Sequence, residues 1–280
     1  MSAEETVRIN RFLAERGVCS RREADEMIVA ERVTIDGALA TVADRVDPAR
    51  QVVRVDGKEL PDAPPKVYYL LYKPKGTITS RDDPRGRKSV LDLVEHLQVR
   101  VEPVGRLDFD TEGALLLTND GEVAHRLTHP SSKTPKRYLA KVYRTPDEVD
   151  LEKIRKGKVF LEDGAALPAL VRVVEQTDNG NAWVEITVTE GRNRLVRRIF
   201  EALGHPVAKL RRETFATLSI RGMERGDVRP LTTEEVRRIR DLAEGRKPTN
   251  AGKLRRKAGF AVAKPKKKRH GKHRTRKNRG

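Results

Sequence analysis

The net positive charge of this 280-residue chain lies mainly at one end, and this limits which part of the chain can fold. Residues 246–280 contain 16 lysines and arginines and no Asp or Glu, whereas the residues before them contain 43 basic and 41 acidic side chains. A dense positive run with few apolar residues cannot bury enough surface to offset the entropy lost on ordering. We therefore predict a disordered basic tail over residues 243–280, attracted to nucleic acid through its phosphates.

The rest of the sequence excludes several classes of protein. No apolar run approaches the roughly 20 residues that span a bilayer, so we expect no membrane-spanning segment. The start of the chain is acidic and polar rather than basic and then apolar, so we expect no secretory signal and a cytoplasmic location. Cys19 is the only cysteine, which excludes a disulfide within the chain and a zinc site built from several cysteines. We expect no bound metal.

The first 62 residues have the pattern of a small separate domain. Apolar residues at helical spacing predict a helix over residues 8–15, and Gly17 follows where that helix would end. Ser20 and Glu23 have the spacing of a capping box at the start of a second helix. The Asp-Gly dipeptide at 36–37 favours a tight turn between two short strands. We therefore predict an N-terminal domain over residues 1–62.

A second domain is predicted over residues 66–242, after a linker marked by prolines at 61, 64 and 65. The apolar patterns predict strands at 67–72, 101–104, 114–118, 137–143, 167–174, 182–188 and 207–218. They predict helices at 90–95, 193–203 and 232–242. Because strands outnumber helices and do not alternate regularly with them, we predict an α+β fold with a mixed, largely antiparallel sheet.

Residues 8–37 resemble the S4 RNA-binding domain in their arginine-rich first helix, small-residue turn, Ser-Arg-Arg helix start and following hairpin. Exposed arginines and a helix N-terminus suit phosphate groups. For any single arginine, the alternative is an ordinary solvated helix face. The resemblance implies that the domain binds RNA, and the candidate RNA-binding residues are Arg8, Arg11, Ser20, Arg21 and Arg22.

The loop at residues 105–112 combines Arg106 with three acidic residues, Asp108, Asp110 and Glu112. A loop held between two strands can present a carboxylate in a fixed direction. Three acids within five residues also suggest a cation site, but no matching ligand set lies nearby in the sequence, and Arg106 opposes one. From the residues alone, an acidic surface turn is the favoured interpretation.

Four blocks in order change this interpretation, because they resemble the motifs of the RsuA-type pseudouridine synthases, which modify ribosomal RNA. The blocks are YKPKG at 72–76, GRLD at 105–108, KRY at 136–138 and EGRNRLVRRI at 190–199. The chain departs from the usual pattern at Tyr72, Ala114 and Leu195, which stand in place of Asn, Leu and Gln. The resemblance implies a pseudouridine synthase domain in which Asp108 is the catalytic residue and no cofactor takes part.

Asp108 must be ionised to take part in this reaction, and a partly desolvated pocket disfavours the charged form. Its carboxylate can attack the sugar, stabilise positive charge at C1′ or remove a ribose proton, and the sequence leaves the choice open. The resemblance implies that Arg197 pairs with Asp108, with Arg198 as the alternative. The residues themselves show only that four arginines crowd this segment, Arg192, Arg194, Arg197 and Arg198.

Tyr138 has an aromatic face that can stack on uracil and a hydroxyl that can take part in proton transfer at C5, although a tyrosine of the strand core is the alternative. The target nucleotide must leave its helical stack to expose the glycosidic bond. We expect Arg106 to hold the opened RNA, unless it pairs with Asp110 or Glu112. The remaining candidates for RNA contacts are Lys73, Lys75 and Arg192.

Together these patterns predict a cytoplasmic, monomeric enzyme that isomerises one uridine of ribosomal RNA, free or in a precursor of a ribosomal subunit. The long basic extension resembles that of the family's large-subunit enzymes and favours 23S over 16S RNA. The alternative is a non-catalytic RNA-binding factor for ribosome assembly, which the complete set of motifs disfavours. A third interpretation, a DNA-binding polycation, requires that deletion of residues 246–280 abolish all binding.

Overall fold

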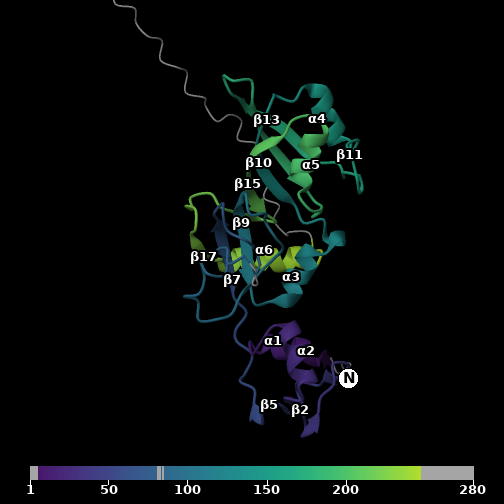
Figure 1. Cartoon of the computed structure of the whole chain (residues 1–280), viewed down its shortest axis with the longest axis vertical. Coiled ribbons are helices and arrows are strands. Elements are labelled where there is room, and N and C mark those ends of the chain that lie inside the picture. Colours follow the sequence, from purple (N-terminus) through teal and green to yellow (C-terminus); the bar gives the residue numbers. More distant parts are fainter. Residues whose placement is uncertain (1–5, 81–82, 84, 247–280) are drawn as a thin grey trace, which may run out of the picture. The chain divides into compact units, whose positions relative to one another are not determined.

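The computed structural model describes residues 6–80, 83 and 85–246 (Figure 1). The predicted tail lies outside the described residues except for 243–246, and Ala243 is still the last residue of a helix. The described part contains an N-terminal domain of two helices and short strands, followed by a larger α+β domain built on a mixed sheet. This confirms the predicted fold class. Within those residues, no helix combines the length and apolar character needed to cross a membrane.

The N-terminal domain packs two helices against a small sheet, with Ile9, Leu13 and Val33 fully buried in its core. Ser20 caps the second helix as predicted: its hydroxyl accepts a hydrogen bond from the Glu23 N–H at 3.2 Å, and the Glu23 carboxylate accepts one from the Ser20 N–H. Strands β3, β2, β5 and β6 form one sheet in that order, and β1 pairs with β4. The elements are β1 (Val7–Arg8), α1 (Ile9–Glu15), α2 (Arg21–Val29), β2 (Val33–Ile35), β3 (Ala38–Leu39), β4 (Arg45–Val46), β5 (Val53–Val55) and β6 (Lys58–Glu59).

The larger domain is built on a sheet whose main path runs β13-β14-β10-β15-β9-β7-β17. Strand β16 pairs with β15 and β8 with β9, and every pairing in this sheet is antiparallel except that of β9 with β15. Its strands are β7 (Tyr68–Lys73), β8 (Glu102–Pro103), β9 (Thr111–Thr118), β10 (Lys136–Val142), β13 (Leu170–Gln176), β14 (Ala182–Val188), β15 (Val207–Phe215), β16 (Leu218–Ser219) and β17 (Val228–Pro230). A separate hairpin consists of β11 (Phe160–Leu161) and β12 (Gly164–Ala165).

Helices cover both faces of this sheet, because the central strands bury both of their sets of alternating side chains. In β9, Leu115 and Leu117 belong to one apolar core, whereas Ala114 and Leu116 belong to the other. The first core includes side chains of α4 and α5, and the second includes side chains of α3 and α6. The helices are α3 (Gly121–Thr128), η1 (Pro130–Ser132), α4 (Glu148–Arg155), α5 (Leu195–Ala202) and α6 (Thr233–Ala243).

Gly113 lets two central strands approach closely where the 105–110 loop enters the sheet. It has a φ of +124°, and a Cβ atom added to it would lie 2.2 Å from the carbonyl oxygen of Arg212 on β15. Only glycine fits such a contact and such a backbone conformation. The parallel register aligns Gly113 with Arg212, so the loop before β9 lies beside β15.

Candidate active site

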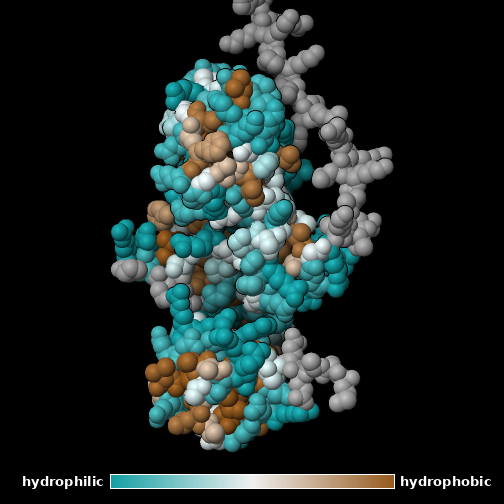
Figure 2. Space-filling model, turned by 90° about the vertical axis from the view of Figure 1, so that its right-hand side faces the viewer, coloured by the Kyte–Doolittle hydropathy of each residue, from teal (hydrophilic) through white to brown (hydrophobic). Residues whose placement is uncertain are grey.

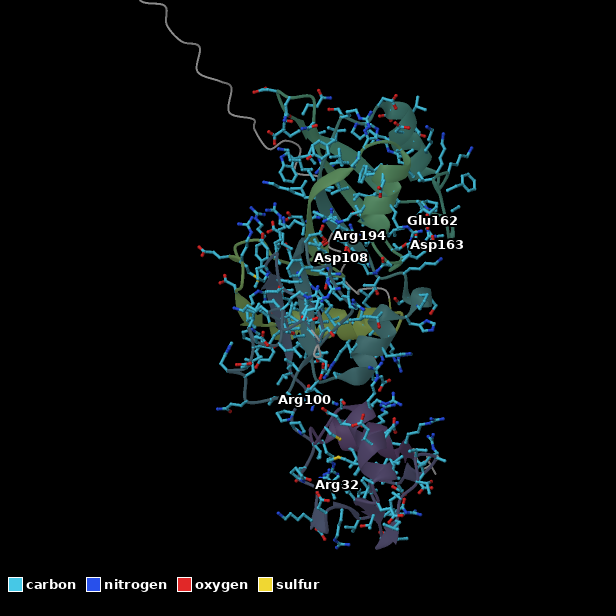
Figure 3. All side chains as sticks on the ribbon, viewed as in Figure 1. Arg32, Arg100, Asp108, Glu162, Asp163 and Arg194 are labelled. Atoms are coloured by element: carbon cyan, nitrogen blue, oxygen red, sulfur yellow. The ribbon has the colours of Figure 1, made fainter. Side chains whose placement is uncertain are left out.

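Motifs that are far apart in the sequence line one cavity of about 360 Å³ in the larger domain. Its lining comes from the loop at 105–108, from β10 and β15, and from the segment 190–196 that leads into α5. Asp108, Tyr138 and Arg194 all face this cavity, and Figure 3 shows Asp108 beside Arg194. The cavity therefore gathers a carboxylate, an aromatic ring and a guanidinium around one small volume.

Buried polar side chains hold the backbone of the loop that carries Asp108 through hydrogen bonds. Lys73 at the end of β7 is fully buried, and its ammonium donates to the carbonyls of Asp108 at 3.1 Å and Thr111 at 2.8 Å. The hydroxyl of Thr79 donates to the carbonyl of Leu107 at 2.9 Å. These contacts hold the Asp108 side chain at a defined place in the cavity, as catalysis by a positioned group requires.

Lys73 does not fit its predicted role as an RNA contact. Its side chain has no exposed surface, and its ammonium donates to the carbonyls of Pro74, Asp108 and Thr111. Burial lowers the pKa of Lys73 to about 8, and the nearby Asp108 and Asp110 partly oppose this shift. The lysine therefore supports the loop rather than a phosphate.

The carboxylates of Asp108 and Asp110 meet two arginines of the last motif. The Nη1 atom of Arg194 lies 3.8 Å from an oxygen of Asp108 and 3.8 Å from an oxygen of Asp110. Arg197 pairs instead with Asp110 at 2.9 Å, while it donates to the carbonyl of Val207 at 3.1 Å. The expected ion pair between Arg197 and Asp108 is thus not the one found, because Val207 holds the guanidinium where it reaches Asp110. Among the described residues, Arg194 is the arginine that forms an ion pair with the Asp108 carboxylate.

Arg194, which lies beside Asp108, has an unusual backbone conformation. It is the N-cap residue of α5 and has φ 47°, a left-handed conformation that is uncommon for residues other than glycine. Such conformations cost energy and cluster at functional sites. The sequence marked Arg194 only as one of four crowded arginines, and no local signal distinguished it from its neighbours.

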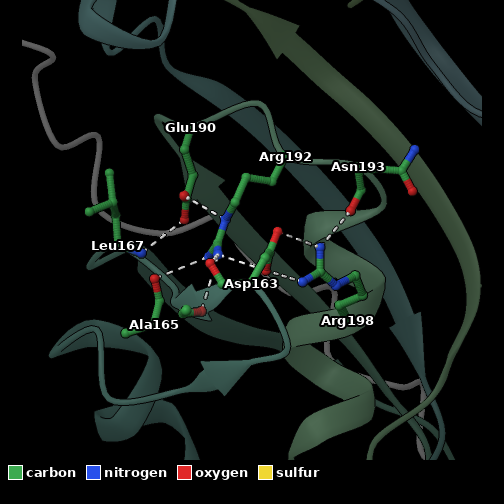
Figure 4. A network of polar contacts seen from close by, with 8 residues as sticks. Asp163, Ala165, Leu167, Glu190, Arg192, Asn193 and Arg198 are labelled. Atoms are coloured by element: carbon green, nitrogen blue, oxygen red, sulfur yellow. Dashed lines mark hydrogen bonds and ion pairs between the residues drawn. The ribbon is translucent and has the colours of Figure 1, made fainter.

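Arg192 and Arg198 both bind the turn between β11 and β12 (Figure 4). Arg192 donates to the Asp163 carboxylate at 2.9 Å and to the backbone carbonyls of residues 163–165 at 3.1 to 3.3 Å. Arg198 donates to the same carboxylate, and this lowers the pKa of Asp163. Arg198 therefore pairs with Asp163 and not with Asp108, and the Nη donors of Arg192 are engaged within the chain.

The structure places Tyr138 and Arg106 at the cavity and Lys75 on the surface. Tyr138 on β10 is 9% exposed, lines the cavity and also belongs to the adjacent apolar core, so both interpretations of this residue hold in part. Arg106 is exposed at the cavity, and none of the described residues forms an ion pair or hydrogen bond with it. Lys75 is also exposed.

In the N-terminal domain, the predicted arginines are exposed, whereas the Ser20 hydroxyl serves as a helix cap. Arg11 pairs with Glu15 at 2.7 Å, and Arg21 donates to Asn10 at 3.3 Å. Figure 2 shows that the domain also exposes apolar surface. The exposed arginines are Arg8, Arg11, Arg21 and Arg22, and the exposed large apolar residues are Val29, Leu39, Val42 and Val52.

Two cations of the cavity had no role in the sequence analysis. Lys136 on β10 and Arg212 on β15 line it together with Tyr138. The alternation of side chains along a strand could have identified Lys136, since Lys136 and Tyr138, two residues apart, share one face. Arg212 comes to the cavity through the pairing of β10 with β15. In the described part of the chain, no group of three or more His, Cys, Asp or Glu side chains is arranged to hold a metal ion.

An Asp-bearing loop, a tyrosine and arginines line one cavity of a mixed sheet, and a small domain with exposed arginines precedes them, as expected for an enzyme that modifies RNA. Residues 67–202 match the RNA pseudouridylate synthase family, and residues 7–52 match the S4 domain. A crystal structure of a pseudouridylate synthase resembles this one with a TM-score of 0.60 and 28% sequence identity, over 83% of this chain and 99% of that one.

Several relatives in sequence are named ribosomal large subunit pseudouridine synthase B. The protein of Bacillus subtilis (strain 168) is 42% identical over 238 residues, which cover 85% of this chain and 97% of the relative. That of Haemophilus influenzae is 38% identical over 84% of this chain and 67% of the relative. The chain belongs to the RNA pseudouridine synthase family and carries an S4 domain. The resemblance inferred from the motifs is thereby confirmed.

Proposed function

We propose that this pseudouridine synthase isomerises a uridine of ribosomal RNA, and specifically of the 23S RNA of the large subunit. The names of the relatives support this substrate, as does the basic C-terminal sequence. The S4 domain, with the predicted range 1–62, docks the RNA through its exposed arginines. The domain of predicted range 66–242 performs the reaction. A location in the cytoplasm and a monomeric state stay predictions.

The observation that carries the proposal is the Asp108 carboxylate held inside the cavity with Arg194 3.8 Å away. The reaction breaks the bond from ribose C1′ to uracil N1, turns the base and joins C1′ to C5. Asp108 acts on the sugar, whether as nucleophile, as counter-charge at C1′ or as base. Arg194 places a positive charge beside the Asp108 carboxylate, and Arg197 fixes the neighbouring Asp110.

Tyr138 and Arg106 handle the displaced nucleotide in this proposal. A flipped base exposes both its faces, and stacking on an aromatic side chain replaces part of the stacking lost in the RNA. Tyr138 offers such a face inside the cavity. Arg106, exposed at the same cavity and unpaired within the described residues, binds the opened RNA backbone together with Lys75.

The test compares 23S and 16S transcripts that carry tritium at uridine C5, since isomerisation at C5 releases this label as water. We expect the enzyme to release label from the 23S transcript at one position, which sequencing of the modified RNA identifies. Release from 16S RNA alone would refute the large-subunit assignment. RNA binding without release from either RNA or from assembling particles would instead favour the non-catalytic assembly factor.

A further inference from the structure

The inner surface of the active cavity carries two cations on neighbouring strands. In the pairing of β10 with β15, Tyr138 lies opposite Arg212, and Lys136 lies opposite Phe215. Lys136, Tyr138, Arg212 and Phe215 all line the cavity that contains Asp108. A flipped uracil stacked on Tyr138 would therefore have a lysine and an arginine beside it on the same sheet face.

Arg212 is buried without a counter-charge. It is 2% exposed, its Nε donates to the carbonyl of Ala114 at 2.7 Å, and its guanidinium lies 5.0 Å from the centre of the Phe215 ring. Its Nη2 atom is buried and has no hydrogen-bond partner. No acidic side chain among the described residues forms an ion pair with it.

Lys136 is only partly buried, and it also lacks a counter-charge among the described residues. Its ammonium donates to the carbonyl of Thr134 at 2.9 Å, and it forms no ion pair within the described part of the chain. Burial lowers the pKa of Lys136 to about 8, and the positive charge of Arg212 acts in the same direction, against a weaker opposing effect of Glu190. The two cations thus repel one another inside the protein.

Uncompensated charges in a protein interior are costly, and they are retained mainly where a ligand or a reaction supplies the opposite charge. The anion that suits this place must reach the inner end of the cavity, beside Tyr138. RNA phosphates are drawn first to the exposed Arg106 and to the half-exposed Arg194 at the cavity. The base itself reaches deeper than its phosphates when a nucleotide is flipped into a pocket.

We propose that Lys136 and Arg212 stabilise the negative charge that develops on the uracil ring when its bond to C1′ breaks. This assignment rests on the proposed function. Heterolysis of the C1′–N1 bond leaves the electron pair on N1, and the charge spreads to the O2 and O4 oxygens. C5 then attacks C1′ to form the new C–C bond, the C5 proton leaves, and N1 takes up a proton. Groups that bind charge present only during the reaction raise kcat rather than substrate affinity.

The first test uses Lys136→Met and Arg212→Met, which remove each charge and keep an unbranched side chain, together with Lys136→Arg. Lys141→Met is the matched control, since Lys141 lies on the same strand but contacts Trp183 and does not line the cavity. We expect each Met variant to lower kcat about a hundredfold, as loss of one oxyanion-hole donor does, with unchanged RNA Kd. Lys136→Arg should recover most of the rate, and Lys141→Met should match the wild type.

A phosphate-binding role gives a different result. Loss of a phosphate contact would raise Kd at unchanged kcat and reduce the slope of log K against log salt by about one. That outcome, or an unchanged kcat in both Met variants, overturns the assignment of Lys136 and Arg212. The proposed function still stands in that case, provided that the wild type turns over. A wild type that releases no tritium refutes both.

A second substrate tests the charge itself and does not depend on how well the variants fold. In RNA with 5-fluorouridine at the target, fluorine withdraws electrons and stabilises the uracil anion without help from the protein. We expect the variant-to-wild-type ratio for single-turnover loss of 5-fluorouridine, measured by mass spectrometry of digested RNA, to lie clearly closer to one than the ratio for uridine. An equal ratio for the two substrates would show that Lys136 and Arg212 only maintain structure.

Discussion

Gly113 is the residue at which the smallest chemical change should most disturb the site. Gly113→Ala places a methyl group 2.2 Å from the Arg212 carbonyl oxygen, so β9 and β15 must separate. We expect a loss of at least about 3 kcal/mol in the free energy of unfolding, measured in urea. Gly121→Ala is the control, because nothing lies within 4 Å of its added Cβ. That change should leave stability within about 1 kcal/mol. Similar losses in both variants would contradict the close approach.

Lys73 gives stability a pH dependence that can be isolated by substitution. Its pKa of about 8 in the folded chain lies below the ordinary lysine value. Below pH 8 both states bind the proton and the lysine adds no slope, whereas between about pH 8 and 10 the unfolded state binds more protons, so stability rises with pH.

The expected measurement is the difference in unfolding free energy between wild type and Lys73→Met across this window. We expect the wild type to gain about 2 kcal/mol relative to the variant as the pH rises from 8 to 10. A difference that stays flat, or that falls as the pH rises, would mean that Lys73 is not desolvated in the folded chain.

The order of the motifs predicts that Asp108 and Tyr138 lie together, and both line one cavity. It does not predict which arginine meets which carboxylate, because Asp108 and Asp110 are two residues apart on one loop and a small displacement exchanges their partners. The burial of Lys73 also escapes prediction. A lysine at the end of a strand is exposed or buried according to whether a loop from elsewhere in the sequence covers it.

At the scale of elements, the turn between β11 and β12 positions the segment that carries Arg194. Asp163 in this turn binds Arg192 and Arg198, which flank Arg194 in the sequence. We expect Asp163→Ala to speed amide hydrogen exchange at residues 190–194 and to lower kcat roughly tenfold, with RNA Kd unchanged. The control Glu162→Ala removes an exposed neighbour that forms no ion pair with a described residue. If Asp163→Ala raised Kd but left kcat and exchange unchanged, Asp163 would not be a positioning residue.

Most strands of the larger domain could be predicted, because alternating and continuous apolar runs mark them directly. Strand β14 (Ala182–Val188) has the predicted bounds. The helix predicted over 90–95 is absent, and Val90 and Val94 are buried through turns instead, since four residues of spacing fit one irregular turn as well as a helix. Helices α3 and α4 were missed, although Asp120 and Asp147 cap them and offered a signal.

At the scale of the whole molecule, the basic C-terminal sequence should add affinity without selectivity. Deletion of residues 246–280 removes 16 positive charges. We expect RNA affinity to fall mainly at low salt, with a shallower salt dependence and unchanged kcat at saturating RNA. Filter binding over a salt series measures this. Complete loss of RNA binding at every salt concentration would show instead that the S4 domain docks nothing by itself.

The most direct test of the account compares Asp108→Asn with Asp110→Asn in single-turnover release of tritium from C5-labelled 23S transcript. Both variants remove one carboxylate charge beside Arg194, and melting temperature and RNA Kd control for folding and docking. We predict that Asp108→Asn loses roughly 10⁴-fold or more in rate while it still binds RNA, and that Asp110→Asn, which releases Arg197 and one of the two ion pairs of Arg194, loses about tenfold. Turnover by Asp108→Asn at the wild-type rate, or complete loss in Asp110→Asn alone, would contradict the assignment of Asp108 as the catalytic residue.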